Sequence, residues 1–478
     1  MNLNAFGGEI PAAIEEVVIK RPLATVTVAT APFKGVKTLK SVTVDSLCVA
    51  LGASYFAGCS ALENVSLHEG FTTLNTALFS GTAIKSITIP AGVKDIPSTC
   101  FSGCASLTEV VLSEGLETIS SQAFEGSPVA TITLPQTLTS VGQLAFNGSN
   151  ISGDFVLPAA VKSIGANAFQ NNTAITSVSL PASITSIGDG AFNGCSSIAS
   201  YTVDAANTTF KVKENNALAT IDGSKIVAYP VAHANTEFED TEATAIAAYA
   251  FNGAKNLTKI TTPACVQFGD YSLANTGVLT ASLRGTVGRY VLQGCTSLAE
   301  VTLENGKEIP MGVCKDCTAL TSFKRISDVT ILKQEAFAGC TSLKEVDLGG
   351  LLCIIEADAF KGSAVEKIIV GAATPASMTE GVFTAANSNM TAVVPVECVE
   401  AYKAAEGWKY LNIEGSADVV LKGKTITMPD GLYYASTDGV IYGVDNTGNQ
   451  TSYDVGGVPH TFQLLEFQNR IYGASAGK

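Results

Sequence analysis

The sequence is poor in charged, aromatic and histidine residues. Of its 478 residues, 15% are charged, 7% are aromatic, one is Trp and three are His. The net charge is −14, and no cluster of Lys and Arg interleaves with aromatic residues. A chain with this charge repels the phosphate backbone of DNA and RNA, so we expect no nucleic-acid partner.

Long apolar runs are also missing. No stretch approaches the roughly 18 to 20 apolar residues that span a bilayer, so we expect no membrane span in this chain. The N-terminal stretch MNLNAFGGEIPAAIEE lacks the basic segment and apolar core of an export signal. It fits either the start of a soluble chain or the start of a mature domain whose export signal has been removed.

The sequence contains no arrangement typical of a catalytic or cofactor site. His68, His233 and His460 lie in different segments, and none is beside a candidate nucleophile. Clustered carboxylates fall in turns or inserts, where they more often solvate a surface: Glu15 and Glu16, then Glu237, Glu239 and Asp240. No glycine-rich phosphate motif lies between a strand and a helix. We therefore expect no enzyme activity, no cofactor and no metal.

A phenylalanine in the motif A-F-x-G recurs at a nearly constant interval of about 22 to 23 residues, a period typical of solenoids. The first eight anchors are Phe33, Phe56, Phe79, Phe101, Phe124, Phe146, Phe169 and Phe192, and a second series has Phe251, Leu273, Leu292, Cys314, Phe337, Phe360 and Phe383. Each repeat can bury its apolar face only against its neighbours, so we predict about fifteen stacked coils.

Each coil should contain one short strand and two turns. The unit is A-F-x-G-C-x-S-L-x-x-V-x-L-P-x-x-V-x-x-I-G, and its L-x-x-V-x-L part alternates at period two. In one coil Leu62, Val65 and Leu67 should point inward, and Asn64 and Ser66 outward. Because only the neighbouring coils can cover the apolar edge, no coil should be stable alone.

This unit resembles the BspA-type leucine-rich repeat, which is common in surface and secreted proteins of Bacteroides-like bacteria. The resemblance extends over roughly residues 20–415. It implies a β-rich, right-handed solenoid of 22–23-residue coils, no enzyme activity, and adhesion or ligand binding at the cell surface or outside the cell. It also implies that about residues 391–415, with Pro395, Tyr402, Trp408 and Ile413, cap the solenoid through a Val-Pro strand and a short helix.

An insert interrupts the repeat between Phe192 and Phe251. The step between these two anchors exceeds one coil by about 36 residues, whereas an uninterrupted array keeps its period. The insert, about residues 204–243, has a D-G turn at Asp222 and Gly223 between two β-like runs. We predict a hairpin that stands off the solenoid. It either borders a binding face or is a tolerated surface excursion.

The solenoid should occupy residues 1–415, and residues 416–478 should form a separate β-rich segment. A Y-x-A-S theme recurs there, with Leu432 and Ile471 separated by about 39 residues, near the length of one β-propeller blade. The segment therefore resembles the start of a propeller. Either further blades, which could carry an enzyme, have been cut off, or the segment is a small β-meander against the solenoid end. We favour truncation.

Twelve cysteines suggest a metal site or disulfides, but six share one repeat position after the motif glycine. These are Cys59, Cys104, Cys195, Cys295, Cys317 and Cys340. We expect them to stack as small, buried hydrophobic residues. Cys314-x-x-Cys317 is a weak metal or redox motif because no second pair or nearby His accompanies it. Cys48, Cys100, Cys265, Cys353 and Cys398 share no spacing, which argues against a regular disulfide framework.

The remaining candidate site is the exposed row of the predicted sheet. The outward residue before the last inward strand position is Thr43, Ser66, Thr88, Thr133, Ser179, Thr202, Thr261, Ser282 and Thr302, and then Lys324, Asp347 and Ile369. We take Thr88, Thr133, Ser179, Thr202, Thr261, Ser282 and Thr302 as candidate binding residues. The alternative is that Thr suits a half-exposed strand on propensity alone.

Two functional hypotheses follow. The first is an extracellular or cell-surface binding or adhesion protein, expected to be a monomer, that presents the strand face to a protein partner. The second is a carbohydrate-binding accessory protein of a glycan-uptake system. Exposed aromatics would favour the second, because sugars stack on them, and the outward strand positions contain none.

The cysteine analysis makes a prediction. Thiol titration of the native protein should label few of the twelve cysteines, and titration of the denatured protein should label nearly all of them. Mass spectrometry that finds several disulfides would contradict the ladder interpretation.

Overall fold

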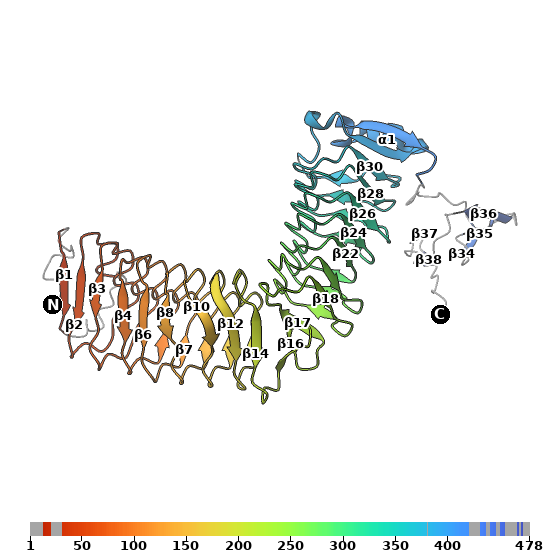
Figure 1. Ribbon diagram of the computed structural model, residues 1–478. Coiled ribbons are helices and arrows are strands. Elements are labelled where there is room, and N and C mark those ends of the chain that lie inside the picture. Colours follow the sequence, from red (N-terminus) through yellow and green to blue (C-terminus); the bar gives the residue numbers. More distant parts are fainter. Residues whose placement is uncertain are drawn as a thin grey trace.

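A computed structural model describes residues 13–20, 31–379 and 381–419, and beyond them five strand segments between residues 431 and 471. The chain forms a β-solenoid of about 17 turns of roughly 22 residues. Two arms of stacked coils meet at a sharp bend near β16 and β17 (Figure 1). The predicted solenoid fold is confirmed, with slightly more turns than the fifteen expected.

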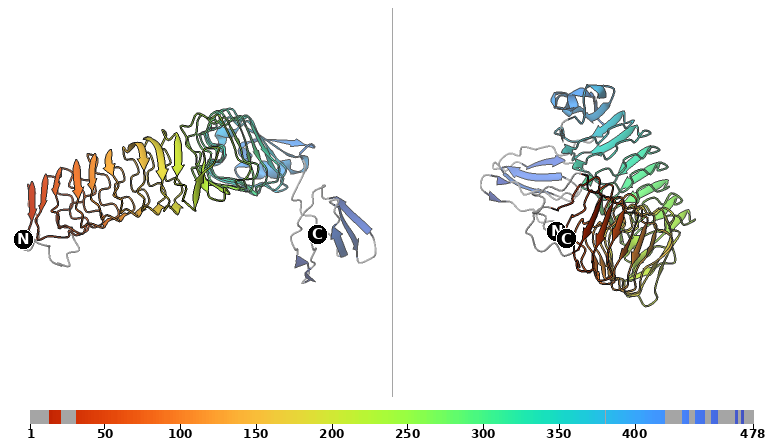
Figure 2. Two further views of the ribbon diagram at one scale, coloured as in Figure 1. Left: turned by 60° about the horizontal axis from the view of Figure 1, so that its bottom comes forward. Right: turned by 90° about the vertical axis from the view of Figure 1, so that its left-hand side faces the viewer.

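One side of both arms carries the longer strands, which we call the long-strand face; Figure 2 shows them in two further views. Each pairs in parallel with strands of adjoining coils. They are β1 (Glu16–Ile19), β2 (Ser41–Val44), β3 (Asn64–Ser66), β4 (Ser86–Ile89), β6 (Glu109–Leu112), β8 (Thr131–Thr133), β10 (Ser152–Val156), β12 (Ala174–Leu180), β14 (Ser200–Val203), β18 (Glu237–Glu239), β20 (Lys259–Thr261), β22 (Thr280–Leu283), β24 (Glu300–Leu303), β26 (Ser322–Arg325), β28 (Glu345–Gly349), β30 (Lys367–Val370), β32 (Thr391–Pro395) and β33 (Asn412–Ser416).

The other side carries shorter strands, mostly of two residues, which form the short-strand face. They come from the V-x-x-I part of the repeat, where the isoleucine position is buried in most coils. They are β5 (Asp95–Ile96), β7 (Thr118–Ile119), β9 (Ser140–Val141), β11 (Ser163–Ile164), β13 (Ser186–Ile187), β17 (Lys225–Ala228), β19 (Ala245–Ile246), β21 (Gln267–Phe268), β23 (Thr286–Val287), β25 (Glu308–Ile309), β27 (Ile331–Leu332), β29 (Ile354–Ile355) and β31 (Ser377–Met378).

The anchor phenylalanines of the N-terminal arm form one continuous stack. From Phe33 to Phe192, consecutive ring centroids lie 5.2–5.6 Å apart with interplanar angles of 5–16°. The backbone bonds the coils at the same place, as where Phe169 N–H donates to the Ala191 carbonyl at 2.8 Å. Each ring is buried, so the stack sets the spacing of the coils.

One anchor is missing from the predicted series. Tyr229, one coil before Phe251, donates its amide to the Ala250 carbonyl at 2.8 Å and stacks on the Phe251 ring at 5.1 Å. The interruption after Phe192 therefore contains a hidden coil, and the true insertion is shorter than expected. The Tyr-Pro dipeptide at this anchor obscured the A-F-x-G motif.

The six ladder cysteines are buried as predicted, but they are more than small hydrophobic residues. Each thiol donates to the carbonyl of the anchor residue in the preceding coil, at 2.9–3.2 Å. Ser127 and Asn172 occupy the same position and make the same bond, to Phe101 and Phe146. In these coils the position favours a small hydrogen-bond donor, because a buried carbonyl without a partner is costly. Ala254 fills the same position without a side-chain donor.

The other cysteines fill different repeat positions. Cys48 and Cys265 close the turn after a long strand with an amide bond like that of Val93, and Cys100 precedes an anchor phenylalanine. Eleven of the twelve cysteines are buried, and Cys353 is exposed. Cys353 is thus the residue that a native thiol titration should label.

The insert forms the predicted hairpin, but the hairpin does not stand off the solenoid. Strands β16 (Leu218–Thr220) and β17 pair antiparallel around the turn, and β15 (Phe210–Val212) pairs with β16. β17 in turn pairs in parallel with β19. Leu218 and Ile226 have no exposed surface, so the hairpin covers the core where the two arms meet.

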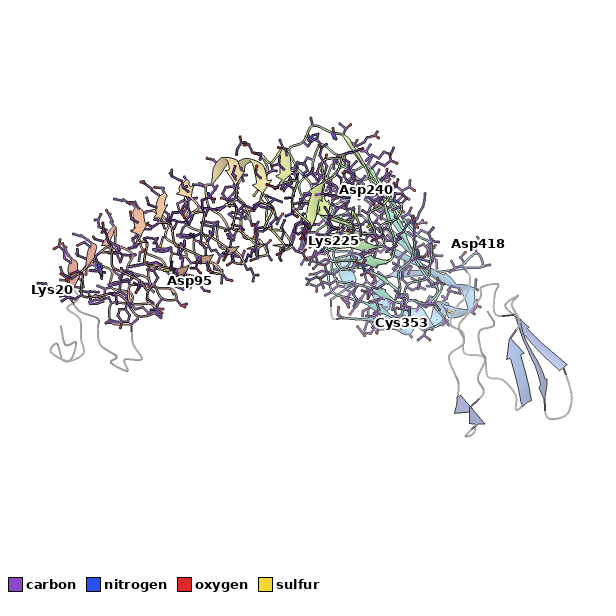
Figure 3. The ribbon with its side chains drawn as sticks, turned by 90° about the horizontal axis from the view of Figure 1, so that it is seen from below. Lys20, Asp95, Lys225, Asp240, Cys353 and Asp418 are labelled. Atoms are coloured by element: carbon purple, nitrogen blue, oxygen red, sulfur yellow. The ribbon has the colours of Figure 1, made fainter. Side chains whose placement is uncertain are left out.

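A buried ion pair lies at the bend. Lys213 Nζ lies 2.7 Å from Asp240 Oδ2, and their side chains are 11% and 1% exposed. Asp240 also accepts the backbone N–H groups of Glu242 and Ala243 at 3.0 and 2.9 Å. Burial acts to raise the pKa of Asp240, but the bonds from Lys213 and these amides outweigh it and lower the pKa. Figure 3 places Asp240 at the bend.

The C-terminal end of the solenoid is covered by a helix and a tryptophan. The short helix η2 (Ala385–Asn387) precedes β32. After β32 come η3 (Val396–Cys398), α1 (Val399–Ala404) and η4 (Trp408–Tyr410). Trp408 and Tyr402 have no exposed surface, and they donate to the Ala376 and Ala372 carbonyls at 2.9 Å. The Trp408 ring continues the aromatic stack at 6.0 Å from Phe383.

Beyond residue 419 the described residues are all in strands. β34 (Gly431–Ala435), β35 (Val440–Asp445) and β36 (Gln450–Asp454) form an antiparallel sheet, and β37 (Glu466–Phe467) pairs with β38 (Arg470–Ile471). The segments between them, with His460, lie outside the described residues. The domain limit at 415 and the propeller blade therefore stay predictions.

The first prediction from this fold concerns the buried ion pair. Asp240→Ala leaves the Lys213 ammonium without its main acceptor, so the free energy of unfolding at pH 7 should fall by about 3–5 kcal/mol. Because the folded pKa lies below the unfolded value of about 3.9, the wild-type advantage is complete above about pH 4 and is lost as the pH falls through the folded pKa. Urea unfolding by circular dichroism at pH 7 and at lower pH measures both effects.

The control for this prediction is Glu237→Ala, on the strand that precedes Asp240. The Glu237 side chain is 68% exposed, so its loss should cost no more than about 1 kcal/mol. Equal losses for the two variants would show that the buried pair is not what stabilises the bend.

The second prediction concerns the end of the solenoid. Deleting residues 396–415 uncovers the Phe383 edge of the aromatic stack, so the truncated protein should aggregate or fray at its last coils. A chain that ends at residue 419 retains the cap and is the control. A monomeric deletion variant with unchanged melting would rule out a capping role.

Candidate binding face

The predicted exposed residues do occupy equivalent positions on neighbouring long strands. The register aligns Thr43 with Ser66; Thr88 with Val111 and Thr133; Val156 with Ser179 and Thr202; Glu239 with Thr261; Ser282 with Thr302 and Lys324; and Asp347 with Ile369. Thr88, Thr133, Thr202 and Ser282 are exposed, and Ser179, Thr261 and Thr302 are half-buried. The row exists as a surface feature, and its role in binding stays a prediction.

The row is less uniform than expected, because valines share it with the hydroxyl residues. Val111 is 47% exposed and Val156 is 66% exposed, and both lie in register with predicted members of the row. Val18 takes the same position beside Thr43. Branching at Cβ is therefore as common in the row as a hydroxyl group, which is what strand propensity alone would produce.

The short-strand face also carries a row of hydroxyl residues. Thr118, Ser140, Ser163 and Ser186 align along β7, β9, β11 and β13. Asp95 begins this row, and Figure 3 places it on the side of the arm away from the long strands. Hydroxyl groups by themselves thus do not identify which face binds.

A hollow of about 730 Å³ lies on the long-strand face. It opens over β8, β10, β12 and β14, and Thr133, Ser179 and Thr202 line it with Ile132 and Val156. Its volume falls within the range of ligand clefts. Three of the seven predicted residues thus come together at one site, and Thr88, Thr261, Ser282 and Thr302 lie elsewhere.

The hollow forms where the long-strand sheet is interrupted. β8 ends one sheet, of order β4-β6-β8, and β10 begins the next, of order β10-β12-β14. The two coils are still bonded on both sides of the gap, by Asn150 N–H to the Val129 carbonyl at 3.0 Å and by Lys162 N–H to the Thr139 carbonyl at 2.8 Å. We call the opening between β8 and β10 the seam.

An extra residue in β10 explains the seam. Three residues separate the buried Ile151 from the buried Phe155, whereas two separate Ile175 from Val178 in the next coil. The extra length is taken up at Gly153, whose φ of 76° suits glycine, and the register of β10 shifts beside it. This spacing is visible in the sequence and could have indicated the site.

The lining of the hollow is acidic. Asp154 accepts hydrogen bonds from Ser177 Oγ at 2.6 Å and Thr176 Oγ1 at 2.9 Å, which lower its pKa and keep it ionised at neutral pH. Asp204 lines the other side and accepts the Ala206 N–H at 2.9 Å. Of the described residues that line the hollow, none carries a positive charge. Thr202 and Ser179 hydrogen-bond each other at 2.9 Å.

The same face of the C-terminal arm is built from paired charges. Lys367 lies 2.9 Å from Glu345, and Arg325 lies 2.7 Å from Asp347. Lys324 pairs with Glu300, and the Ser282 hydroxyl bonds to Glu304. Docking a partner here would require these charges to lose water, which costs free energy.

Three tyrosines gather on the turns before the anchors, away from the strand row. The rings of Tyr249, Tyr271 and Tyr290 stack with centroids 5.1 and 5.0 Å apart. A Cβ added at Gly190 or Gly312 would lie 2.9 or 2.1 Å from the end rings, so these glycines cover the outer faces. The stack therefore presents ring edges, whereas a sugar stacks on ring faces.

Burial also makes the Cys314-x-x-Cys317 motif unsuited to metal or redox chemistry. Burial raises the pKa of Cys314 well above its ordinary value, which disfavours the thiolate, and Cys317 donates to the Leu292 carbonyl at 3.1 Å. Among the described residues, no group of three or more His, Cys, Asp or Glu is arranged to hold a metal ion. No helix in that part of the chain is long and apolar enough to span a membrane.

Several solved bacterial structures are similar to this chain. A leucine-rich repeat protein from Eubacterium ventriosum is 23% identical, with a TM-score of 0.52 over 59% of this chain and 83% of that one. A leucine rich cell surface protein from Faecalibacterium prausnitzii is 19% identical, with a TM-score of 0.41 over 86% and 87%. A Bacteroides ovatus leucine-rich repeat protein is 21% identical, with a TM-score of 0.38 over 85% and 93%. At such identities the first of these supports the fold alone.

Sequence comparison agrees with the fold. No curated protein sequence matches this chain. The profile of the family described as "BspA type Leucine rich repeat region (6 copies)" matches residues 26–152, 152–227, 229–324 and 307–403, which is most of the chain. The chain therefore belongs to the BspA-type leucine-rich-repeat family.

Proposed function

We propose that this protein is a non-catalytic binding or adhesion protein of the cell surface or the extracellular space. It presents the long-strand face of its N-terminal arm, from β8 to β14, to a protein partner. The observation that carries this proposal is the hollow, because three predicted hydroxyl residues converge there and four do not. Leucine-rich-repeat solenoids gain affinity by spreading modest contacts along such extended surfaces.

The charge distribution supports this choice of face. The strands β8, β10, β12 and β14 contain one charged residue, Asp154, so little desolvation of ion pairs opposes docking there. On the C-terminal arm the equivalent strands hold ion pairs such as Lys367 with Glu345. A partner loses less hydration energy by binding the N-terminal arm.

A carbohydrate-binding accessory role is the second candidate, and a neutral hydroxyl-rich surface is compatible with it. Sugar sites usually use exposed aromatic faces. The largest stack of partly exposed aromatic rings in the described part of the chain, Tyr249 with Tyr271 and Tyr290, has its faces covered. We therefore favour the protein partner.

The test uses substitutions that leave the buried positions untouched. Thr133→Ala alone should cost at most one hydrogen bond's net contribution, about 0.5–1.5 kcal/mol of binding free energy. Thr133→Lys, Ser179→Lys and Thr202→Lys together place three cations over the hollow, so binding to cells should fall sharply. Binding of labelled protein to cells and to purified glycans measures the loss, and circular dichroism checks that the fold is unchanged.

The matched control makes the same three changes on the opposite sheet: Thr118→Lys, Ser140→Lys and Ser163→Lys. These side chains lie in register on the short-strand face and should tolerate lysine with binding intact. If the first triple variant binds as the parent does, the long-strand face is not the binding face. If glycan binding falls and protein-dependent cell binding does not, the carbohydrate role replaces the one proposed.

A further inference from the structure

The seam leaves two strand edges without strand partners. β8 and β10 are terminal strands of two separate sheets, so along the seam their backbone N–H and C=O groups lack ladder bonds to each other. Edge strands are templates for pairing with another extended chain. The hollow of about 730 Å³ opens over both edges and gives room for an occupant.

The side chains around the seam alternate as the neighbours of an added strand should. Val156 is 66% exposed at the outward position of β10, and it lies in register with Ser179 on β12. Ile132 is half-buried in β8 and lines the hollow beside Thr133. The outward positions of β8, β10 and β12 thus alternate between hydroxyl and apolar groups, with Thr133, Val156 and Ser179. An added strand uses such alternating neighbours for specificity.

The charge of the site selects among extended segments. Asp154 and Asp204 line the hollow, and none of the described lining residues is Lys, Arg or His. Ser177 and Thr176 hold Asp154 in place through hydrogen bonds at 2.6 and 2.9 Å. An acidic partner would be repelled here, and a basic one would be attracted.

We propose that the seam between β8 and β10 binds an extended polypeptide segment with Lys or Arg side chains, through backbone bonds to a strand edge and ion pairs to Asp154 and Asp204. This inference rests on the proposed function, since it names the chemistry of the protein partner at the same face. It assigns the seam, rather than the hydroxyl row as a whole, as the place where recognition occurs.

The experiment measures fluorescence anisotropy of labelled heptapeptides added to the full chain. The probes are TKVKVKT, its acidic counterpart TEVEVET, and two forms of the basic peptide that are N-methylated on alternate amides. The basic peptide should bind at least about tenfold more tightly than the acidic one, the size of one or two partly exposed ion pairs. The peptide should pair with one of the two edges, and the amides of an added strand alternate in direction. One N-methylated form should therefore lose binding and the other should retain it.

The protein variants separate specific binding from attraction to a chain of net charge −14. Asp154→Asn with Asp204→Asn should weaken the basic peptide about tenfold, as two partly exposed ion pairs would. Asp95→Asn is the matched control, since Asp95 also accepts a serine hydroxyl, from Ser120 at 2.9 Å, but lies on the opposite side (Figure 3). It should leave the affinity unchanged.

Equal affinities for the acidic and basic peptides, or equal effects of the two N-methylated forms, would overturn the seam proposal. The proposed function would still stand if, in the same protein preparation, the three lysine substitutions on the long-strand face abolish binding to cells. If purified glycans displace the basic peptide and bind more tightly than it does, the seam is a sugar site and the peptide inference is wrong.

Discussion

The constant spacing of the anchor stack is the constraint on which the rest of the structure depends. The Phe124 and Phe146 rings lie 5.2 Å apart, although the second coil carries an extra residue in β10. The step from Phe146 to Phe169 is 23 residues, as is the next step to Phe192, so the coil is no longer than its neighbour. Its turn before Ile151 is one residue shorter, and its strand has the extra residue. Gly153 absorbs it, and β10 leaves the register of β8. The seam is therefore a consequence of a rigid core combined with one coil in which a residue has moved from the turn into the strand.

Much of the fold could be predicted from the sequence because each coil repeats the same physical solution. The anchor series, the alternation of Leu62, Val65 and Leu67, and the buried ladder cysteines all follow from period and residue size. Tyr229 escaped detection because tyrosine before proline satisfies the same stack without the motif. The prediction that the hairpin stands off the solenoid was wrong because the residue pattern predicts strands but not the strands they pair with. β17 pairs with β19, which belongs to the next coil.

The candidate site was harder to predict, and the reason is that outward positions of a strand are under weak local constraint. Thr133 and Val156 fit the same half-exposed position equally well, so a hydroxyl there carries little information. A similar row on the short-strand face, with Ser140 and Ser163, makes the same point. What marks the candidate site is one extra residue in the strand β10, which alters the shape of the surface rather than its composition. The spacing between Ile151 and Phe155 is the sequence feature that could have indicated the site.

The two arms offer partners different energetics. On the C-terminal arm, side chains such as Arg325 and Asp347 already form ion pairs with each other. An incoming partner must therefore remove water from these pairs, and it forms few new charge interactions that offset this desolvation cost. In the hollow, hydroxyl groups hold Asp154 in position, yet the lining provides no countercharge. A cation supplied by a partner would meet an oriented carboxylate with little reorganisation. The bend, where Lys213 pairs with Asp240, separates these two surfaces, and the proposed binding site lies on the arm where docking costs least.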